Sequence, residues 1–259
     1  TDAPFGIKKG VAFNNPDAAQ ILSRPNSATW SYNWGGVTNA PAFQQIPMCH
    51  GPGWDCDSDR ILRRIAENRD TPYVLGYNEP DFPRGYGGVE ASPQAAYDNW
   101  GNDMFKFNDR GAKLVCPAIS SYNTKEGFMG YESGLQWLRK FASIGNNPSQ
   151  FRCSAQAIHW YGWEGESIQD QAKSFMKYVE EAHREVNDIF RKEMPLWITE
   201  FAPEPRNHAD KANRMAQFLN IVVPWLDRQD YVHRYAPFWA EDMVDLGSRQ
   251  PNAAGWAFV

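Results

Sequence analysis

Three features of the sequence predict an α/β fold of the (β/α)8 TIM-barrel type. Eight short apolar runs follow one another, amphipathic segments lie between most of them, and the length suits one such domain. Parallel barrels of this size are commonly single domains, so residues 1–259 are expected to form one domain. An open doubly wound sheet is the alternative, but no glycine-rich nucleotide motif follows any of the runs.

The eight runs are expected to be buried parallel strands, because they are short, apolar and rich in β-branched and aromatic residues. In chain order they cover residues 8–14, 28–34, 45–50, 71–79, 112–120, 154–161, 195–202 and 231–239.

The segments between most of these runs have helical patterns. One begins at Ser92, an N-cap residue followed by Pro93, and closes at Gly111. Further helices are expected over residues 131–144, 167–193 and 208–228, with Pro224 kinking or splitting the last.

Two stretches depart from the ideal barrel. The link GGVTNAPAFQ between the second and third strands is too short and too rich in Gly and Pro for a full helix. The tail after Trp239 has no clear helical period. Reduced or missing helices are therefore expected after strands two and eight.

The overall charge and hydropathy exclude several kinds of partner. The formal net charge is −5 and no basic stripe is present, so no nucleic acid and no anionic membrane is expected as a partner. No run approaches the roughly 20 apolar residues of a membrane span. No signal-peptide pattern opens the chain at Thr1, which fits either a mature form or an intracellular protein.

The four cysteines favour two disulfides in a secreted protein. Cys49 and Cys56 would close a loop, and Cys116 and Cys153 lie on neighbouring strands of the expected barrel. Four buried thiols in a cytosolic enzyme are the alternative. A zinc site at Cys49, His50 and Cys56 lacks a fourth ligand and the usual spacing, so no metal is expected there.

Two glutamates stand where strands are expected to end. In LGYNEPD, residues 75–81, Pro80 cannot continue a sheet and leaves Glu79 at the carboxyl end of the fourth strand. In LWITEFAPE, residues 196–204, Glu200 ends the seventh strand in the same way. A lone strand-end glutamate is more often a solvated loop residue or a helix cap. A pair that converges at the barrel mouth is what glycoside hydrolysis requires.

Neighbouring residues add to this interpretation. Asn78 precedes Glu79 and offers an amide to a substrate hydroxyl. Along the sixth strand, alternate residues change from small to polar aromatic, so His159 and Tyr161 are expected to face the mouth. His159 would bind a sugar hydroxyl, and Tyr161 would donate a hydrogen bond to a carboxylate nucleophile. A satisfied core role is the alternative for each.

Aromatic residues are abundant, with 11 Trp, 11 Tyr and 15 Phe. Four tryptophans fall at or just beyond strand ends, and their faces would stack on the C–H faces of sugar rings. At least two of the four are expected to line a groove and the others to be packing residues: Trp34, Trp160, Trp163 and Trp239.

The ordered motifs VAFN, SYNW, LGYNEPD, AIHWYG and LWITEFA resemble glycoside hydrolase family 128, compact clan A β-1,3-glucanases with a reduced barrel. The resemblance covers most of the chain. It implies that Glu79 is the acid/base, that Glu200 is the nucleophile and that Asn78 assists. Trp34, Trp163 and Trp239 remain substrate-binding candidates from their positions alone.

We therefore expect a secreted, extracellular or cell-wall hydrolase, a monomer that retains configuration on β-1,3-glucan polysaccharide or oligosaccharide. No cofactor is expected, and no carboxylates have the spacing of a calcium loop. Two alternatives stay open: a non-catalytic protein that binds β-glucan oligosaccharides on the same barrel, and a clan A hydrolase of another β-glycan.

Overall fold

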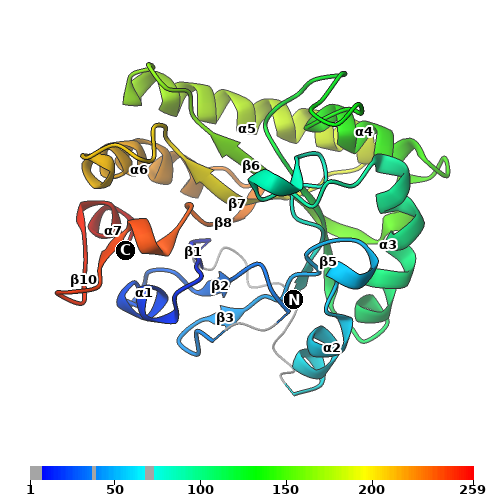
Figure 1. The fold of residues 1–259 in the computed structure, drawn as a ribbon, viewed down its shortest axis with the longest axis horizontal. Coiled ribbons are helices and arrows are strands. Elements are labelled where there is room, and N and C mark those ends of the chain that lie inside the picture. The colour runs from blue at the N-terminus through cyan, green and yellow to red at the C-terminus, as the bar shows by residue number, and fades with distance from the viewer. Residues whose placement is uncertain (1–7, 37–38, 68–72) are drawn as a thin grey trace.

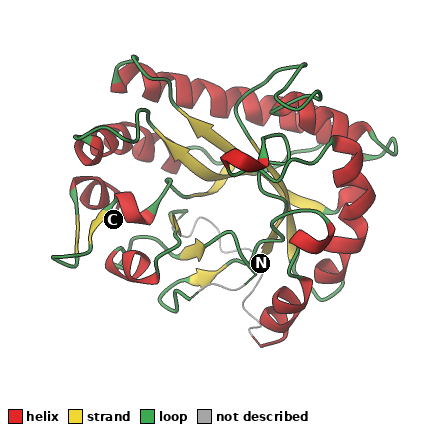
Figure 2. Cartoon of the chain, viewed as in Figure 1, coloured by secondary structure: helices red, strands yellow, loops and turns green. Residues whose placement is uncertain are grey.

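A computed structural model describes residues 8–36, 39–67 and 73–259, an α/β fold built around a curled parallel sheet (Figures 1 and 2). This sheet has five strands in the order β4-β5-β6-β7-β8. Their bounds are Tyr73–Leu75, Lys113–Ile119, Cys153–Tyr161, Leu196–Ala202 and Val232–Tyr235. Four of these strands lie within the runs expected from the sequence, and β6 begins at Cys153, one residue before its run. Residues 71 and 72 of the fourth run lie outside the described residues.

A second parallel sheet contains β1 (Gly10–Ala12), β2 (Trp30–Tyr32) and β3 (Gln44–Gln45). Single parallel bridges join the two sheets at both edges, Lys9 to Tyr235 beside β8 and Met48 to Leu75 on β4. β3 is shorter than the expected run 45–50, because Pro47 has no N–H to continue the ladder.

The helices lie on the outside of the curled sheets (Figure 1). They are α1 (Pro16–Ile21), α2 (Ser58–Glu67), α3 (Pro93–Asn108), α4 (Leu135–Ser143), α5 (Ile168–Phe190), α6 (Lys211–Asp227) and α7 (Ala253–Phe258). No described residue between β2 and β3 is helical. After β8 the chain forms a small antiparallel hairpin of β9 (Val244–Asp245) and β10 (Gln250–Pro251) before the six-residue α7.

Helix boundaries follow the capping residues. Ser92 caps α3 by accepting a hydrogen bond from the backbone N–H of Ala95, and Pro93 is the first helical residue, as expected. The helix expected from residue 131 begins only at Leu135, because Gly134 takes a left-handed φ of 62°. α6 continues through Pro224 without being split.

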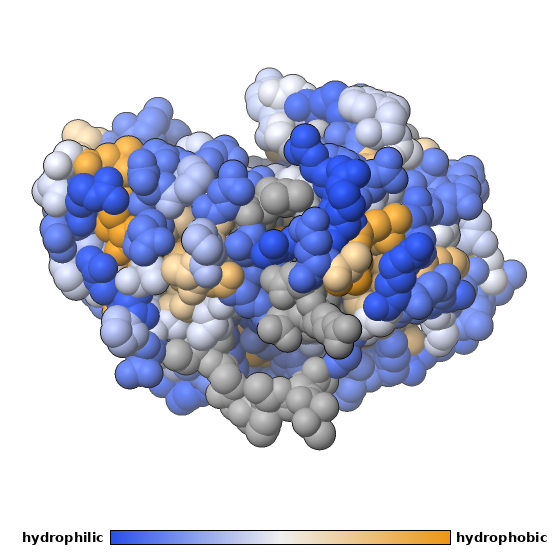
Figure 3. Space-filling view, turned by 90° about the horizontal axis from the view of Figure 1, so that it is seen from below, coloured by the Kyte–Doolittle hydropathy of each residue, from blue (hydrophilic) through white to orange (hydrophobic). Residues whose placement is uncertain are grey.

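Two buried apolar clusters hold these layers together. The larger lies between the sheets and the helices, and the smaller fills the space inside the strands. We call the second the inner cluster: Ala12, Trp30, Tyr32, Ile46, Met48, Leu75, Val115, Ala118, Ala155, Ala157, Trp197 and Ala236. On the face seen in Figure 3 the surface is mostly hydrophilic, and hydrophobic residues lie in separate small groups.

Both expected disulfides are present, Cys49–Cys56 and Cys116–Cys153. Their formation removes the thiols that a zinc site at Cys49 and Cys56 would use. The helices in the described ranges are all too short or too polar to span a membrane.

Candidate active site

An irregularity in the pairing of β6 with β7 brings Glu200 into the interior. Ile158 pairs with Ile198, but the next pair is His159 with Glu200, so Thr199 is an extra residue on β7. In a regular strand, Thr199 and Glu200 would face opposite sides of the sheet. The bulge re-aims them, and both side chains reach the end of the inner cluster near His159.

Glu79 reaches the same place through an unusual backbone conformation. It follows β4, its N–H donates to the carbonyl of Ala118 beyond the middle of β5, and its φ is 42°. A left-handed φ is uncommon for a non-glycine residue and marks a position that the surrounding structure must hold. Trp34, which follows β2, has the same feature with φ 61°.

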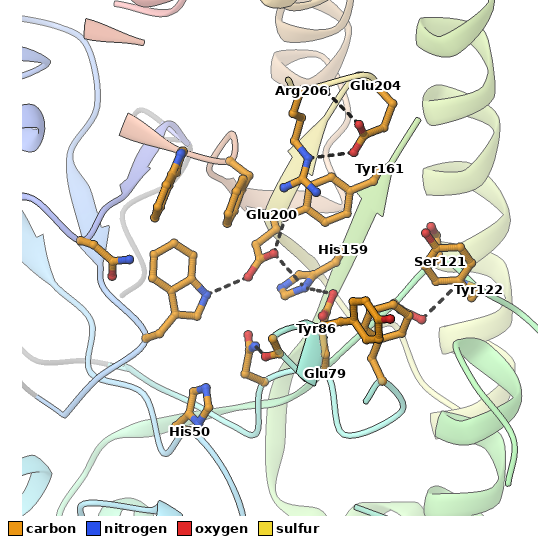
Figure 4. Close-up of a pocket in the computed structure, with 18 residues that line it drawn as sticks. His50, Glu79, Tyr86, Ser121, Tyr122, His159, Tyr161, Glu200, Glu204 and Arg206 are labelled. Carbon is orange, nitrogen blue, oxygen red and sulfur yellow. Dashed lines mark hydrogen bonds and ion pairs between the residues drawn. The ribbon is translucent and has the colours of Figure 1, made fainter. Parts of the chain in front are cut away.

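His159 lies between the two glutamates (Figure 4). Its Nδ1 is 2.8 Å from Oε1 of Glu79 and 3.5 Å from Oε2 of Glu200. Its Nε2 is 2.8 Å from Oγ1 of Thr199. The two carboxylates and the imidazole are all buried, and one oxygen or nitrogen atom from each of the three lies within 4.8 Å of the other two. The two carboxylates therefore converge on one point, as expected, although Glu200 lies within β7 and not at its end, because the strand continues to Ala202.

Two further donors fix the carboxylate of Glu200. The hydroxyl of Tyr161 donates to Oε2 at 2.5 Å, and Nε1 of Trp34 donates to Oε1 at 2.7 Å. The predicted hydrogen bond from Tyr161 to a carboxylate is present. His159 was expected to bind a sugar hydroxyl, but both of its ring nitrogens already face protein atoms, Oε1 of Glu79 and Oγ1 of Thr199.

The pKa of Glu79 is raised, first by burial and then by the negative charge of Glu200 and Asp81. The hydrogen bond and charge of His159 act in the opposite direction without reversing the shift. Burial acts to lower the pKa of His159, but the carboxylates of Glu200 and Glu79 outweigh it and the pKa of the imidazole is raised. The site thus favours a proton on Glu79 and a positive charge between the two acids.

Glu79, His159 and Glu200 lie in the wall of a pocket of about 420 Å³ at the carboxyl ends of the strands (Figure 4). Loops after seven strands contribute to its lining, together with residues of β6 and β7. The lining mixes aromatic rings with hydroxyl, amide and charged groups: Asn14, Trp34, His50, Asn78, Glu79, Phe82, Tyr86, Gly87, Ser120, Ser121, Tyr122, His159, Tyr161, Glu200, Glu204, Arg206, Phe238 and Trp239. This size and mixture suit a ligand that is both polar and flat.

Asn78 lines this pocket and carries an unpaired hydrogen-bond acceptor. Its Nδ2 donates to the carbonyl of Gly87 at 3.1 Å, which fixes the orientation of the amide because a carbonyl can only accept. Its buried Oδ1 has no hydrogen-bond partner in the part of the chain that the structure describes. A buried acceptor without a partner costs stability, so a ligand hydroxyl that donates to it would gain free energy.

The four candidate tryptophans separate into three environments. Trp34 and Trp239 line the pocket, so at least two of the four lie at a groove as expected. Trp160 is buried and stacks on Phe218 in the larger apolar cluster between the sheets and the helices. Trp163 is exposed and lies outside the pocket lining, in edge contact with Tyr122.

Several pocket residues were not singled out from the sequence. Phe82 and Tyr86 follow Glu79 in the same loop, and Tyr122 follows β5. Arg206 lies 4.6 Å above the ring of Tyr161 and bonds to Glu204 through Nε at 2.8 Å. Their position shortly after expected strands could have identified them, because the same criterion selected the four candidate tryptophans.

The same three side chains are the group, within the described ranges, that could hold a metal ion: Glu79, His159 and Glu200. Their atoms bond to one another, and Tyr161 and Trp34 donate to both oxygens of Glu200. An ion would have to displace these donors, so the donor set fits an acid–base pair better than a metal centre.

Comparison with known proteins places the chain among carbohydrate enzymes. The family described as glycosyl hydrolase catalytic core matches residues 10–254. Alkali-sensitive linkage protein 1 of Schizosaccharomyces pombe is 24% identical over 229 residues, which are 86% of this chain and 36% of that protein. The chain thus spans about a third of the length of this curated relative.

Solved structures of family 128 enzymes resemble the whole fold. A curdlan-specific exo-β-1,3-glucanase of Blastomyces gilchristii, in complex with glucose, is 26% identical with a TM-score of 0.79, covering 98% of both chains. An endo-β-1,3-glucanase of Sorangium cellulosum is 23% identical, with TM-score 0.75 over 97% of both. One of Amycolatopsis mediterranei in complex with laminarihexaose is 23% identical, with TM-score 0.71 over 98% of both. The resemblance inferred from the motifs is confirmed.

Proposed function

This chain belongs to the glycosyl hydrolase catalytic core family, and from that premise we propose that it hydrolyses β-1,3-glucan with retention of configuration. The observation that carries the proposal is the pair of buried glutamates, of which one oxygen each lies within 4.8 Å of the other and of one imidazole nitrogen. Retaining enzymes hold their carboxyl groups about 5 to 5.5 Å apart, whereas inverting enzymes leave about 6.5 to 9.5 Å for a water molecule. The β-1,3 linkage is supported by the substrates named for the similar structures.

In the first step, Glu200 attacks the anomeric carbon while the glycosidic bond breaks and Glu79 protonates the departing oxygen. Burial and, more weakly, the Glu200 charge raise the pKa of Glu79 against the opposing effect of His159, which favours the protonated acid that this step requires. Once Glu200 is esterified its charge is lost and the pKa of Glu79 falls. Glu79 then removes a proton from water, whose oxygen attacks the same carbon and releases Glu200.

His159, Tyr161 and Trp34 position the two acids. His159 contacts both, and its other nitrogen is held by Thr199. Tyr161 and Trp34 each hold one oxygen of Glu200. This replaces the sugar-binding role expected for His159 with a positioning role.

Substrate contacts follow from the remaining pocket residues. The unpaired Oδ1 of Asn78 would accept a hydrogen bond from a sugar hydroxyl. Trp34 and Trp239 form a cluster of rings with Phe238 beside Glu200, with centroids 5.0 to 6.3 Å apart, and would bind the sugar whose anomeric carbon reacts. Trp163 would bind sugar farther out.

We further propose that the two parallel sheets form one closed eight-stranded barrel and a single catalytic domain. The bridges at Lys9 and Met48 support closure. An extracellular or cell-wall location is supported by the two disulfides, which persist in oxidising compartments.

Incubation with laminarin, followed by a reducing-sugar assay and by NMR of the products within minutes, tests the proposal. Reducing ends should accumulate and appear first as the β anomer. A first product with the α configuration would make the nucleophile assignment of Glu200 wrong. Binding of laminarin without any reducing ends would instead identify a glucan-binding protein, and release of sugar from mannan or β-1,4-glucan alone would overturn the linkage.

A further inference from the structure

A connected group of aromatic side chains extends outward from the pocket. We call it the aromatic strip, and its members are Phe82, Tyr86, Tyr122, Phe128 and Trp163. Three of them are largely exposed, with relative exposures of 80% for Tyr86, 51% for Phe128 and 60% for Trp163. Large aromatic side chains gathered on a surface mark a binding site more often than isolated ones do.

The strip is organised around one stacked pair. The rings of Phe82 and Tyr122 lie 5.4 Å apart at 7° to each other. Phe128 packs at right angles against both, at 5.1 and 5.3 Å, and Trp163 packs edge-on against Tyr122 at 6.0 Å. Because the rings fix one another, a ligand that stacks on the exposed ones pays less to order them.

The strip is continuous with the pocket. Phe82, Tyr86 and Tyr122 also line it, whereas Phe128 and Trp163 lie beyond the lining residues. The strip comes from the loops after β4, β5 and β6. A ligand too long for the pocket would therefore reach the strip without leaving the surface.

The strip lies on the Glu79 side of the pocket. Figure 4 shows Tyr86 and Tyr122 beside Glu79, and Glu79 precedes Phe82 and Tyr86 in one loop. The indole of Trp34 bonds to Glu200 instead and forms a separate ring cluster with Phe238 and Trp239. The two carboxylates are thus flanked by different aromatic groups.

We propose that the aromatic strip binds the glucosyl residues on the leaving-group side of the cleaved bond. The inference rests on the proposed function and extends it from the reacting bond to the side of the substrate that departs. The general acid must touch the glycosidic oxygen, so the departing sugars begin at Glu79 and continue along the strip. Uncharged rings suit the C–H faces of a neutral glucan, and continuity with the pocket favours this occupant over a protein.

Cleavage of laminarihexaose labelled at its reducing end tests the proposal. Trp163→Ala with Phe128→Ala should weaken binding of the departing sugars, so bonds closer to the reducing end are cut and the labelled product becomes shorter. The rate constant kcat/KM for the hexasaccharide should fall roughly tenfold. A longer labelled product would place the strip on the opposite side, and an unchanged pattern and rate would overturn the proposal.

Two controls separate binding from folding. An aryl β-laminaribioside has no sugar on its leaving-group side, so the double variant should hydrolyse it at the unaltered rate. Trp256→Ala removes a tryptophan of similar exposure, 56%, on α7 and outside the pocket lining, and should change neither pattern nor rate. If only the terminal non-reducing bond is ever cut, the loss in kcat/KM should instead grow with chain length.

Binding to an inactive variant distinguishes failure of this inference from failure of the proposed function. In a Glu200→Gln background, Trp163→Ala with Phe128→Ala should raise the Kd of laminarihexaose roughly tenfold. The Kd of laminaribiose should change much less. If the active protein cleaves no β-1,3-glucan, the proposed function fails; the strip remains a glucan site only if this difference in Kd is found, and an equal Kd for both variants overturns it.

Discussion

The two ends of the inner cluster are built from the same strands but differ in what they contain. At the amino end, Trp197 packs against Trp30 at 5.3 Å and Tyr73 at 4.8 Å, with the guanidinium of Arg234 at 4.8 Å from its ring. At the carboxyl end, β7 places Glu200 beside a pocket of about 420 Å³. A few residues along one strand separate a filled space from an open one.

The backbone differs between the two ends as well. At the amino end β1 pairs regularly with β2, although the pairing register shifts between Leu114 and Val115 on β5 and between Leu196 and Trp197 on β7. The carboxyl end has the bulge at Thr199 and positive φ values at Glu79 and Trp34. Strain of this kind costs stability and is retained where it orients functional groups, so substitutions at the two ends should fail in different ways.

The largest effect should come from the two acids at the carboxyl end. Glu79→Gln and Glu200→Gln should each lower polysaccharide hydrolysis by at least about 10³-fold with little loss of stability. On an aryl glycoside, whose leaving group needs little protonation, Glu79→Gln should give a burst and then a stall that azide relieves as a β-glycosyl azide. Glu200→Gln should give no burst. If neither change alters hydrolysis, the two glutamates are only structural.

At the amino end, Trp197→Ala should act on stability alone. Removing this buried ring leaves a cavity among Trp30, Tyr73 and Arg234, which should cost about 3–5 kcal/mol of the free energy of unfolding. Denaturant titration measures the loss, and activity per folded molecule should be retained. Trp197→Phe keeps a ring and loses an indole N–H that has no partner among the described residues, so it should cost less. A fall in activity per folded molecule would show that the two ends are coupled.

The amino end could be predicted from the sequence because its signal is periodic. Alternate small and large apolar residues such as Ala155, Ala157 and Trp197 define which face is inside. Both glutamates were placed at the mouth because proline after an apolar run marks the end of a strand. The regular part of the fold needed only these patterns.

The details of the carboxyl end follow no period. In strict alternation Glu200 would face outward like Ile198, and only the bulge at Thr199 turns it inward. Bulges depend on the pairing of two strands that lie far apart in sequence, so a single run does not reveal them. Trp160 and Trp163 illustrate the same limit, since one is core and the other exposed although both are near a strand end.

The bulge itself offers an intermediate test. Thr199→Val keeps the shape but removes the hydroxyl that holds Nε2 of His159, so the imidazole should lose its orientation between the acids. We expect kcat to fall roughly tenfold while stability changes by about 1 kcal/mol. Thr199→Ser keeps the hydroxyl and should retain most of the activity. Equal activity of the valine and serine variants would remove Thr199 from the positioning network.

The smallest effect should be a pH-dependent gain in stability from Glu79→Gln. Burial, Glu200 and Asp81 raise the pKa of Glu79 in the folded state above its unfolded value. A group with a raised folded pKa stabilises the fold fully below its unfolded pKa and loses that contribution as pH rises through the folded pKa. Glutamine cannot ionise and is spared the loss. The variant should therefore gain about 1 kcal/mol near pH 7.5 and less near pH 4, which is roughly 2–4 °C in Tm for a chain of this size.

Thermal unfolding at both pH values, with Glu164→Gln as a control, measures this difference. Glu164 lies exposed in the loop after β6, so the Glu164→Gln variant should have the same Tm as the unaltered protein at both pH values. The sign is the informative part, because His159 opposes the shift: its hydrogen bond and positive charge both favour ionised Glu79. If Glu79→Gln lowers Tm near pH 7.5, the attraction of His159 outweighs burial and Glu79 is held ionised, as a base rather than an acid. A gain confined to high pH would instead mean that burial outweighs the attraction of His159, so that ionising Glu79 is unfavourable in the folded protein.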